Sequence, residues 1–330
     1  MIDYISNIKW KKWIAYLVLV VLIILFPVLV NDSYIIHLVI MALTWGVVVT
    51  NWNLTLGYGG MFHIAQPTFF GIGLYAAAVS AVSLGLSPWL CMLIGGIVSF
   101  MASLVIGIPA LRVKGMYLIL LTFAFHFTIS ELVFQFSKYT GGSMGLTVPT
   151  FTLGSIIFSP LHLAPYYYVA IIILILSILV TWVIMRKPIG KSLIAIRDSE
   201  VLAPCIGISI FRSKITTFAI SAFITGIAGG FYAHYTMVVS PEQFSFNLIV
   251  NAFAMIIIGG VGTLFGPVIG SFIITFLTEL FRSFETYRPI IVGLIIILML
   301  IFAPNGFVQG IKTLFNWARE ILVQKKIYNN

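Results

Sequence analysis

The sequence predicts an all-α integral membrane protein with about ten transmembrane helices, some of them broken or re-entrant, and with both termini cytoplasmic. Of its 330 residues, 61% are hydrophobic and only 8% are charged, and the mean hydropathy is +1.12. Soluble domains carry about 25% charged residues, so a soluble globular protein is excluded. Disorder is excluded as well, because so apolar a chain does not stay solvated.

The apolar runs give the spans, because a helix that crosses the bilayer needs roughly 20 apolar residues. The first run, 13–30, resembles a signal peptide, but it contains Pro27 and no small-residue cleavage site follows it, which favours an anchor. The whole chain, 1–330, is predicted to be one transmembrane domain. The further runs are 34–55, 67–86, 88–110, 116–136, 166–185, 215–237, 247–262, 263–281 and 289–303.

The distribution of basic residues predicts the orientation. With a cytoplasmic N-terminus, 15 of the 18 Lys and Arg residues fall on the inside, and the other three, Lys138, Arg282 and Arg288, fall outside. Cytoplasmic loops are the ones that carry such an excess, so the net charge of +9 indicates membrane topology rather than nucleic-acid binding. The predicted non-membrane segments are an outer loop at about 137–165, an inner loop at about 186–214 and a C-terminal tail at about 304–330 on the inner lipid surface.

Small residues recur at helical spacing in three places. Such residues let membrane helices approach closely, so we expect a packing role for them. They are Gly95, Ser99, Ser103 and Gly107; Gly226 and Gly230; and Gly262, Gly266 and Gly270.

Two glycine clusters predict interruptions of the helices, because Gly and Pro both disfavour a helix interior. The first is Gly57-Tyr58-Gly59-Gly60 and the second is the segment 259–267. Broken helices often line binding sites in transporters, although a simple cytoplasmic turn between two spans explains the first cluster equally well. The candidate translocation path consists of Gly57, Gly59, Gly60, His63, Gln66, Gly259, Gly260 and Gly262.

The sequence lacks the motifs of a catalytic or metal-binding chain. It has no phosphate-binding loop for a nucleotide and no His-Glu-x-x-His motif. Its five histidines are scattered, and its two cysteines, Cys91 and Cys205, are too few for a zinc site. We therefore expect no catalytic residue, no metal and no cofactor bound by this chain. Among charges near spans, Glu279 and Arg282 are spaced to pair on a helix.

The inner loop predicts a short amphipathic helix. Leu193, Ile196 and Val201 alternate with charges, Pro204 is expected to shorten the helix by a turn, and Gly207 is a suitable stop. Such a helix docks in a groove of a cytoplasmic partner or lies on the lipid surface.

With these stretches the sequence resembles a known family, the permease subunits of ABC importers for branched-chain amino acids (LivM-type). The resemblance covers nearly the whole chain. Its densest part runs from Gly190 to Arg282 and includes Ser240-Pro241-Glu242-Gln243-Phe244 and Gly259-Gly260-Val261-Gly262-Thr263-Leu264-Phe265-Gly266-Pro267. The chain departs from the family pattern after Gly60, where Ala65 and Gln66 replace a usual serine motif.

The resemblance implies a non-catalytic permease in a bacterial cytoplasmic (inner) membrane, forming half of the path for a small polar solute, with branched-chain amino acids as the expected solute. It implies four kinds of partner: a related second permease, two cytoplasmic ATP-binding subunits that hold ATP-Mg, an extracytoplasmic substrate-binding protein and membrane lipid. The residues expected to couple to the ATPase are Gly190, Lys191, Ala195, Arg197, Asp198, Glu200 and Gly207. Two other classes remain open, namely an ion-coupled secondary transporter that uses the two glycine breaks and, with less support, a membrane enzyme.

Overall fold

The structure is a computed structural model that describes residues 23–30, 32–153, 156–159, 162–284, 287–302 and 306. Within these residues, six helices are long and apolar enough to cross a membrane. They are α2 (Ser33–Asn53, continued by the π-helix η1, Leu54–Tyr58), α3 (Ala65–Leu84), α4 (Pro88–Ala110), α5 (Met116–Gln135), α7 (Ala164–Arg186) and α9 (Ile210–Thr236). The other helices of eight or more residues in that part of the chain are α8 (Pro188–Asp198), α10 (Phe246–Gly259), α11 (Gly266–Leu280) and α12 (Arg288–Phe302).

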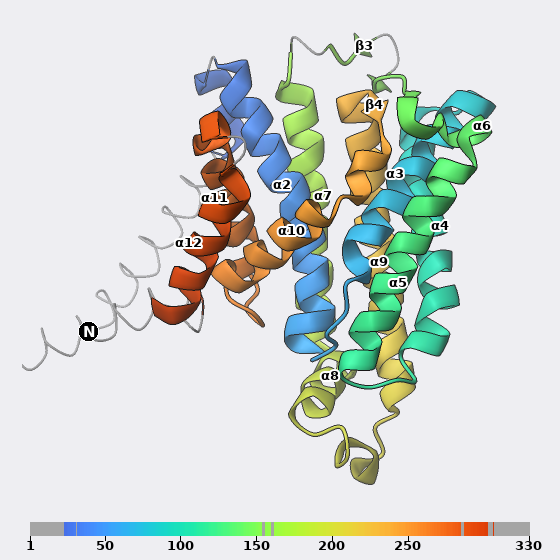
Figure 1. The fold of residues 1–330 in the computed structure, drawn as a ribbon, viewed down its shortest axis with the longest axis vertical. Helices are drawn as coiled ribbons and strands as arrows, with labels where there is room; N and C mark the ends of the chain where they lie inside the picture. Colours follow the sequence, from blue (N-terminus) through green and yellow to red (C-terminus); the bar gives the residue numbers. More distant parts are fainter. Residues whose placement is uncertain are drawn as a thin grey trace, which may run out of the picture.

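Two groups of helices stand side by side (Figure 1). Helix α9 packs along α3 and α4, and α5 covers this group from outside. Helix α2 packs against α7 and α11, with α10 alongside α11. Helix α8 lies beyond the end of the long helices (Figure 1), and we refer to this end of the molecule as the α8 end.

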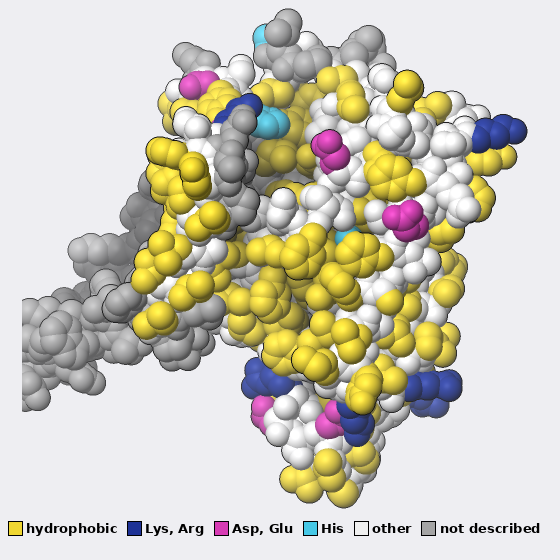
Figure 2. Space-filling model, viewed as in Figure 1, with side chains coloured by type: hydrophobic (Ala, Val, Ile, Leu, Met, Phe, Trp, Pro, Cys, Tyr) yellow, Lys and Arg dark blue, Asp and Glu magenta, His cyan; other side chains and the backbone are white. Residues whose placement is uncertain are grey.

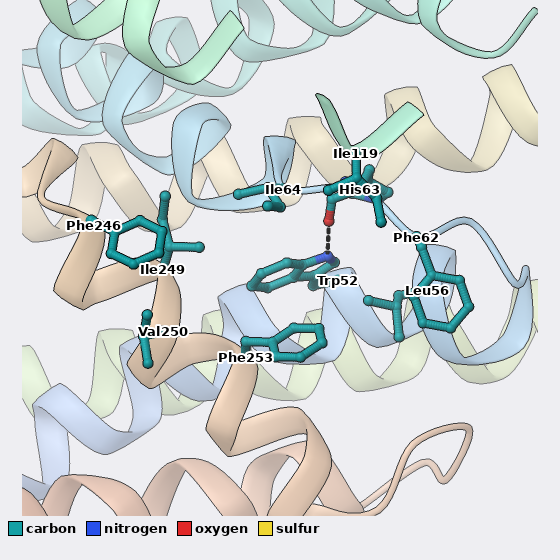
Figure 3. Close-up of a pocket in the computed structure, with 10 residues that line it drawn as sticks. All are labelled: Trp52, Leu56, Phe62, His63, Ile64, Ile119, Phe246, Ile249, Val250 and Phe253. Carbon is teal, nitrogen blue, oxygen red and sulfur yellow. Dashed lines mark hydrogen bonds between the residues drawn. The ribbon is translucent and has the colours of Figure 1, made fainter. Parts of the chain in front are cut away.

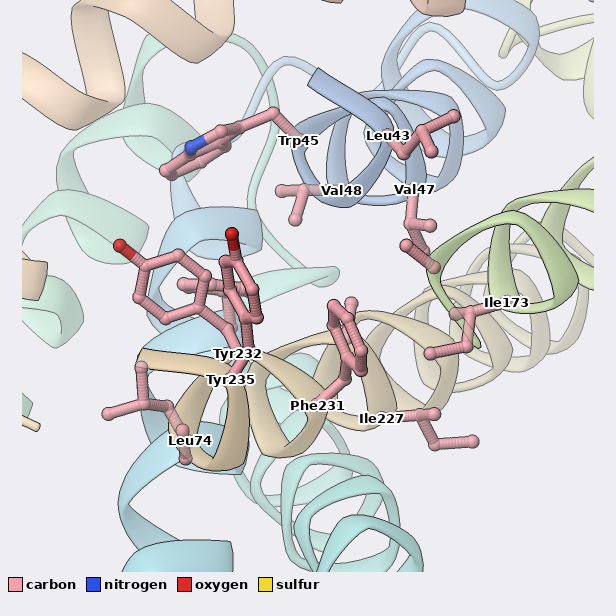
Figure 4. Packing of buried hydrophobic residues seen from close by; sticks show 14 of the residues in the cluster. Leu43, Trp45, Val47, Val48, Leu74, Ile173, Ile227, Phe231, Tyr232 and Tyr235 are labelled. Atoms are coloured by element: carbon pink, nitrogen blue, oxygen red, sulfur yellow. The ribbon is translucent and has the colours of Figure 1, made fainter. Parts of the chain in front are cut away.

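The core joins the two groups through large side chains of α2, α3 and α9. Figure 4 shows Val48 of α2 facing the rings of Phe231 and Tyr235 on α9, with Leu74 of α3 close by. The rings of Phe231 and Tyr235 are stacked, with centroids 5.9 Å apart. These residues are buried by helix packing rather than by lipid, so they fix how the two groups meet.

The end of the molecule opposite α8 carries the small amount of β-structure, which the all-α prediction did not include. Strand β1 (Leu146–Thr147) pairs with β4 (Val238–Val239), and β2 (Thr152–Leu153) pairs with β3 (Ile156–Ile157), both antiparallel. Because β1 to β3 belong to the predicted outer loop, that loop is partly ordered through backbone hydrogen bonds. The short helices α6 (Ser137–Thr140), η2 (Gly142–Met144) and η5 (Arg282–Phe284) lie at the same end. The short helix η4 (Pro241–Phe244) follows β4 and contacts the middle of α5, where the carbonyl of Phe244 lies 2.9 Å from Nε2 of His126.

Six of the ten predicted spans are confirmed as full-length helices. Three more, at 247–262, 263–281 and 289–303, are apolar helices of only 14, 15 and 15 residues. At 1.5 Å per residue such helices are about 20–23 Å long, less than the roughly 30 Å hydrocarbon thickness. The first span, 13–30, is helical at 23–29, and its part at 13–22 lies outside the described residues, as does the C-terminal tail apart from Gly306.

The predicted inner-loop helix exists as α8, but it is shorter than expected. It ends at Asp198, because Ser199 has extended backbone angles, so Val201 lies beyond it. Pro204 begins no α-helical turn; it belongs to the 3-10 turn η3 (Ala203–Ile206). Gly207 ends that turn, with a left-handed φ of +80°, rather than the helix itself.

Candidate functional site

The two predicted glycine breaks meet in space near the α8 end. The side chain of Asn53, at the end of α2, is 1% exposed and bonds the backbone of the loop between α10 and α11. Its Nδ2 donates to the carbonyl of Thr263 at 2.9 Å, and its Oδ1 accepts from the backbone N–H of Gly262 at 2.8 Å. A Cβ on Gly57 would lie only 2.5 Å from the nitrogen of Gly262. The contact therefore requires glycine at position 57.

The first break is an extended segment that turns back into the bundle. The π-helix ends at Tyr58, and α3 begins only at Ala65. Figure 3 shows the indole of Trp52 donating to the carbonyl of His63, at 3.0 Å. The imidazole of His63 is hydrogen-bonded to the hydroxyl of Thr55 at 2.8 Å. The Trp52 bond satisfies a non-helical backbone carbonyl inside the protein, which is where such backbone is tolerated at membrane depth.

A cavity of about 220 Å³ opens beside this segment. It lies between α2 with η1, the segment before α3, α5 and α10, and nearly all of its lining is apolar (Figure 3). Phe62 and Phe246 at its edge are 54% and 55% exposed, so the cavity is open to one side of the chain. Its lining residues are Trp52, Leu56, Phe62, His63, Ile64, Ile119, Phe246, Ile249, Val250 and Phe253.

The candidate path residues do not all reach this cavity. His63 forms part of its wall. Gln66 points the other way, since its side-chain Nε2 donates to the carbonyl of Ser221 at 3.2 Å and to the hydroxyl of Thr225 on α9. The six glycines of the set belong to the two breaks. Gly59 lies at the end of η1, and Gly259 and Gly260 end α10.

Helix α8 sits on the end of the bundle with its apolar face inward. Leu193 and Ile196 are buried, and Leu193 packs with Leu54 and Ile184. A Cβ on Gly190 would lie 2.5 Å from the carbonyl oxygen of Ile184, so the helix lies close against the end of α7. Of the other residues predicted to couple, Lys191, Arg197 and Asp198 are exposed and Ala195 is half-buried.

The turn after α8 is tied to the bundle by an ion-pair cluster. The Glu200 carboxylate lies 2.9 Å from Nζ of Lys214 on α9 and 3.9 Å from Nζ of Lys114 in the loop after α4. The tip of the turn, in contrast, exposes three apolar side chains, at 78%, 65% and 72%: Val201, Leu202 and Ile206. Exposed apolar side chains on this charged end are a feature of contact surfaces.

The small residues of the predicted ladders lie at helix contacts. A Cβ on Gly226 of α9 would lie 2.5 Å from the carbonyl oxygen of Gly95 on α4, and the Ser99 hydroxyl donates to the carbonyl of Phe69 on α3 at 2.8 Å. Gly107 of α4 and Gly230 of α9 continue this contact, and Ser103 of α4 is buried. Gly266 faces Gly259, and Gly270 faces Met255, both between α10 and α11.

Charged residues lie mainly at the two ends of the molecule. Figure 2 shows Lys and Arg side chains near the α8 end and at the opposite end, with a broad hydrophobic area between them. The predicted pairing of Glu279 with Arg282 is confirmed at 3.2 Å. Within the described ranges, no three His, Cys, Asp or Glu side chains lie close enough together to hold a metal ion.

Asn53 and Trp52 are the residues of this site that sequence reasoning missed. The available signal was a pair of polar groups in an apolar span immediately before the first glycine cluster, since polar residues inside membranes are costly and often functional.

Comparison with known proteins places the chain in a family. Residues 34–304 match the model of the branched-chain amino acid transport system permease component. The chain belongs to this permease family. It is therefore a transport subunit rather than an enzyme.

Individual relatives agree with this assignment. The permease is 28% identical over 323 residues to the high-affinity branched-chain amino acid transport system permease protein LivM of Salmonella typhimurium, which covers 91% of this chain and 75% of the relative. It is 24% identical over 272 residues to the probable permease protein LivH of Methanocaldococcus jannaschii, covering 77% and 85% of the two chains. It is also 28% identical over 136 residues to the ribose import permease RbsC of Haemophilus influenzae, covering only 38% and 42%. No solved structure matches the chain.

Proposed function

We propose that this permease is the transmembrane subunit of an ABC importer and forms half of a path for branched-chain amino acids, powered by separate ATPase subunits. The observation that carries the ATP-driven part is the placement of α8. It is an amphipathic helix outside the bundle whose exposed Arg197 donates from Nη1 to the carbonyl of Gly57 at 3.2 Å. A subunit that moves α8 thereby acts directly on the first helix break.

Two ATP-binding subunits, holding ATP-Mg, dock on the α8 end. The exposed tip, formed by Val201, Leu202 and Ile206, supplies apolar contact area, and the exposed charges of α8 supply its polar rim. Glu200 and its two lysines hold the turn in shape for this contact.

A related second permease covers the open side of the cavity between α5 and α10. The edge residues Phe62, Phe246 and Phe253 are well exposed for side chains that border a cavity. The pairing would enclose a path between the two chains, into which an extracytoplasmic binding protein delivers solute. The LivM and LivH names of the relatives favour a distinct partner over a second copy.

The α8 end faces the cytoplasm and the chain lies in a bacterial inner membrane. The support is the gathering of Lys and Arg at that end, as cytoplasmic loops require. The chain offers its own probe, because Cys205 is exposed at the α8 end and Cys91 is buried. A membrane-impermeant maleimide should label inverted vesicles and spare right-side-out vesicles. A Met144→Cys variant, with Cys205→Ser, should give the reverse pattern, since Met144 is 94% exposed at the opposite end.

Branched-chain amino acids are proposed as the solute on two grounds. They are the solutes in the names of the LivM relatives, and an apolar cavity of about 220 Å³ suits an aliphatic side chain. The polar ends of the solute would contact groups supplied from the partner side.

The decisive experiment is reconstitution of the permease with its second permease and ATPase in proteoliposomes. Uptake of radiolabelled leucine, isoleucine or valine should require binding protein and ATP on the α8 side. Uptake driven by an ion gradient without ATP would support the secondary-transporter alternative instead. A complex that hydrolyses ATP and moves no small solute would refute the proposal.

A further inference from the structure

The carbonyl of Gly57 owes its availability to the π-helix. In a continuous α-helix it would accept from the N–H of Met61, four residues later. Here the Met61 N–H donates to the carbonyl of Thr55 instead, at 3.1 Å. The Gly57 carbonyl is thus free to accept from another element, and Nη1 of Arg197 on α8 donates to it at 3.2 Å. π-bulges of this kind are frequent at functional sites.

The same point holds the second break. Asn53 uses both ends of its side-chain amide on the α10–α11 loop, one as donor to Thr263 and one as acceptor from Gly262. A Cβ added to Gly262 would lie 3.7 Å from Nη1 of Arg197, so the guanidinium lies beside this loop. Three segments far apart in the sequence therefore converge here: the end of α2, the α10–α11 loop and α8.

Glycine makes the convergence possible. A Cβ on Gly57 would lie 2.1 Å from Oδ1 of Asn53, and one on Gly60 would lie 2.8 Å from Cγ of Arg197. Gly60 and Gly262 have φ values of +63° and +74°, which side-chain-bearing residues rarely adopt. The close approach and the unusual backbone together distinguish this contact from ordinary helix packing.

We propose that Asn53 and Arg197 form a joint through which α8 moves both helix breaks as one unit, a role that rests on the proposed function. Asn53 positions the α10–α11 loop against the end of α2, and Arg197 connects that pair to α8. Movement of α8 by the ATPase is then transmitted to both breaks at once instead of to one of them. Neither residue contacts solute in this role.

The test compares transport with ATP hydrolysis in the reconstituted complex. Asn53→Ala and Arg197→Ala should each keep hydrolysis stimulated by the binding protein while the solute moved per ATP falls about five- to tenfold, the lower end of the usual range of coupling effects. The double variant should resemble the worse single variant, because both changes break the same joint. Arg197→Lys should recover part of the ratio, since an ammonium can donate one hydrogen bond to Gly57.

The chain supplies a matched control. Asn51 lies on the same helix and is equally buried, but its Nδ2 donates to Ser177 of α7 and to the carbonyl of Val47. Asn51→Ala should keep the wild-type ratio. An Asn53→Ala ratio equal to that of Asn51→Ala would overturn the proposal.

Hydrogen exchange separates this proposal from the proposed function. The N–H of Gly262 donates to Asn53, so Asn53→Ala should speed exchange in peptides that cover 260–265, and Asn51→Ala should not. Equal exchange in the two variants would overturn the joint even in a complex that transports. Absence of ATP-driven uptake by the wild-type complex would defeat the proposed function, and the coupling role would fall with it.

Discussion

Replacement of Gly226 by alanine should force apart a close contact between helices α4 and α9. The added Cβ would lie 2.4 Å from Oγ of Ser99 and 2.5 Å from the carbonyl oxygen of Gly95, whereas ordinary contact begins at 3.4 Å. The α4 and α9 backbones would have to separate by about 0.9 Å. Overpacking of this kind costs about 1–3 kcal/mol, partly offset by the better helix propensity of alanine, up to about 1 kcal/mol. The midpoint of thermal unfolding should fall by about 2–8 °C.

Cys91 is the natural reporter for this experiment, because it lies on α4 and is fully buried. In a Cys205→Ser background, a fluorogenic maleimide reacts with Cys91 only as the helices open. Gly293→Ala is the matched control, since a Cβ at Gly293 meets nothing within 4 Å, and its midpoint should stay the same or rise. A Gly226→Ala midpoint at or above that of Gly293→Ala would refute the reasoning.

Three further predictions concern the α8 end and the cavity wall. Glu200→Gln leaves Lys214, whose side chain is 9% exposed, without its anionic partner. The turn after α8 should therefore lose about 1–2 kcal/mol of stability and be cut faster by protease. Equal cleavage rates would show that the Glu200–Lys214 ion pair does not hold the turn. Gly207 has open space around it but a φ of +80°. Gly207→Asn should therefore be tolerated, whereas Gly207→Val should lower the stability by about 1–3 kcal/mol. Equal unfolding midpoints for these two variants would show that the backbone angle at Gly207 is unimportant. Trp52→Phe removes the donor to the His63 carbonyl. The change should lower the stability by about 1 kcal/mol and speed hydrogen exchange over residues 59–64. Unchanged exchange would show that the Trp52 bond does not hold this segment.

The six long helices could be predicted because each depends only on the hydropathy of its own stretch of sequence. About twenty apolar residues satisfy the bilayer whatever their neighbours are, so the predicted limits of α4, 88–110, agree with the structure at both ends. Hydropathy does not tell where a chain turns within an apolar stretch. The run through 247–281 therefore predicts two spans, whereas the structure has two short helices joined by the glycine loop.

The candidate site was harder to predict because its contacts are long-range. Each glycine cluster is visible in the sequence as a helix break, but the bond from Asn53 to Gly262 joins positions 209 residues apart. A single sequence carries no signal for such a pairing. The inner helix shows the opposite limit, because Leu193 and Ile196 predicted its buried face correctly while its end depended on one extended residue, Ser199.

The inner segment has two anchors of different kinds, and their difference decides how movement of α8 spreads. Glu200 ties it to Lys214 of α9. Helix α9 packs so closely on α3 and α4 that a Cβ added to Gly73 or Gly226 would lie only 2.3–2.5 Å from a backbone carbonyl oxygen of the facing helix. These helices have no room to slide against one another, so we expect them to move as one rigid body with the turn. Arg197 connects the segment to the joint that it forms with Asn53, where hydrogen bonds rather than closely packed backbones hold the parts together. A part held by hydrogen bonds shifts against its neighbours at lower cost than a packed helix contact deforms. Displacement of α8 should therefore move the joint, together with both helix breaks, relative to the rigid group and beside the open cavity.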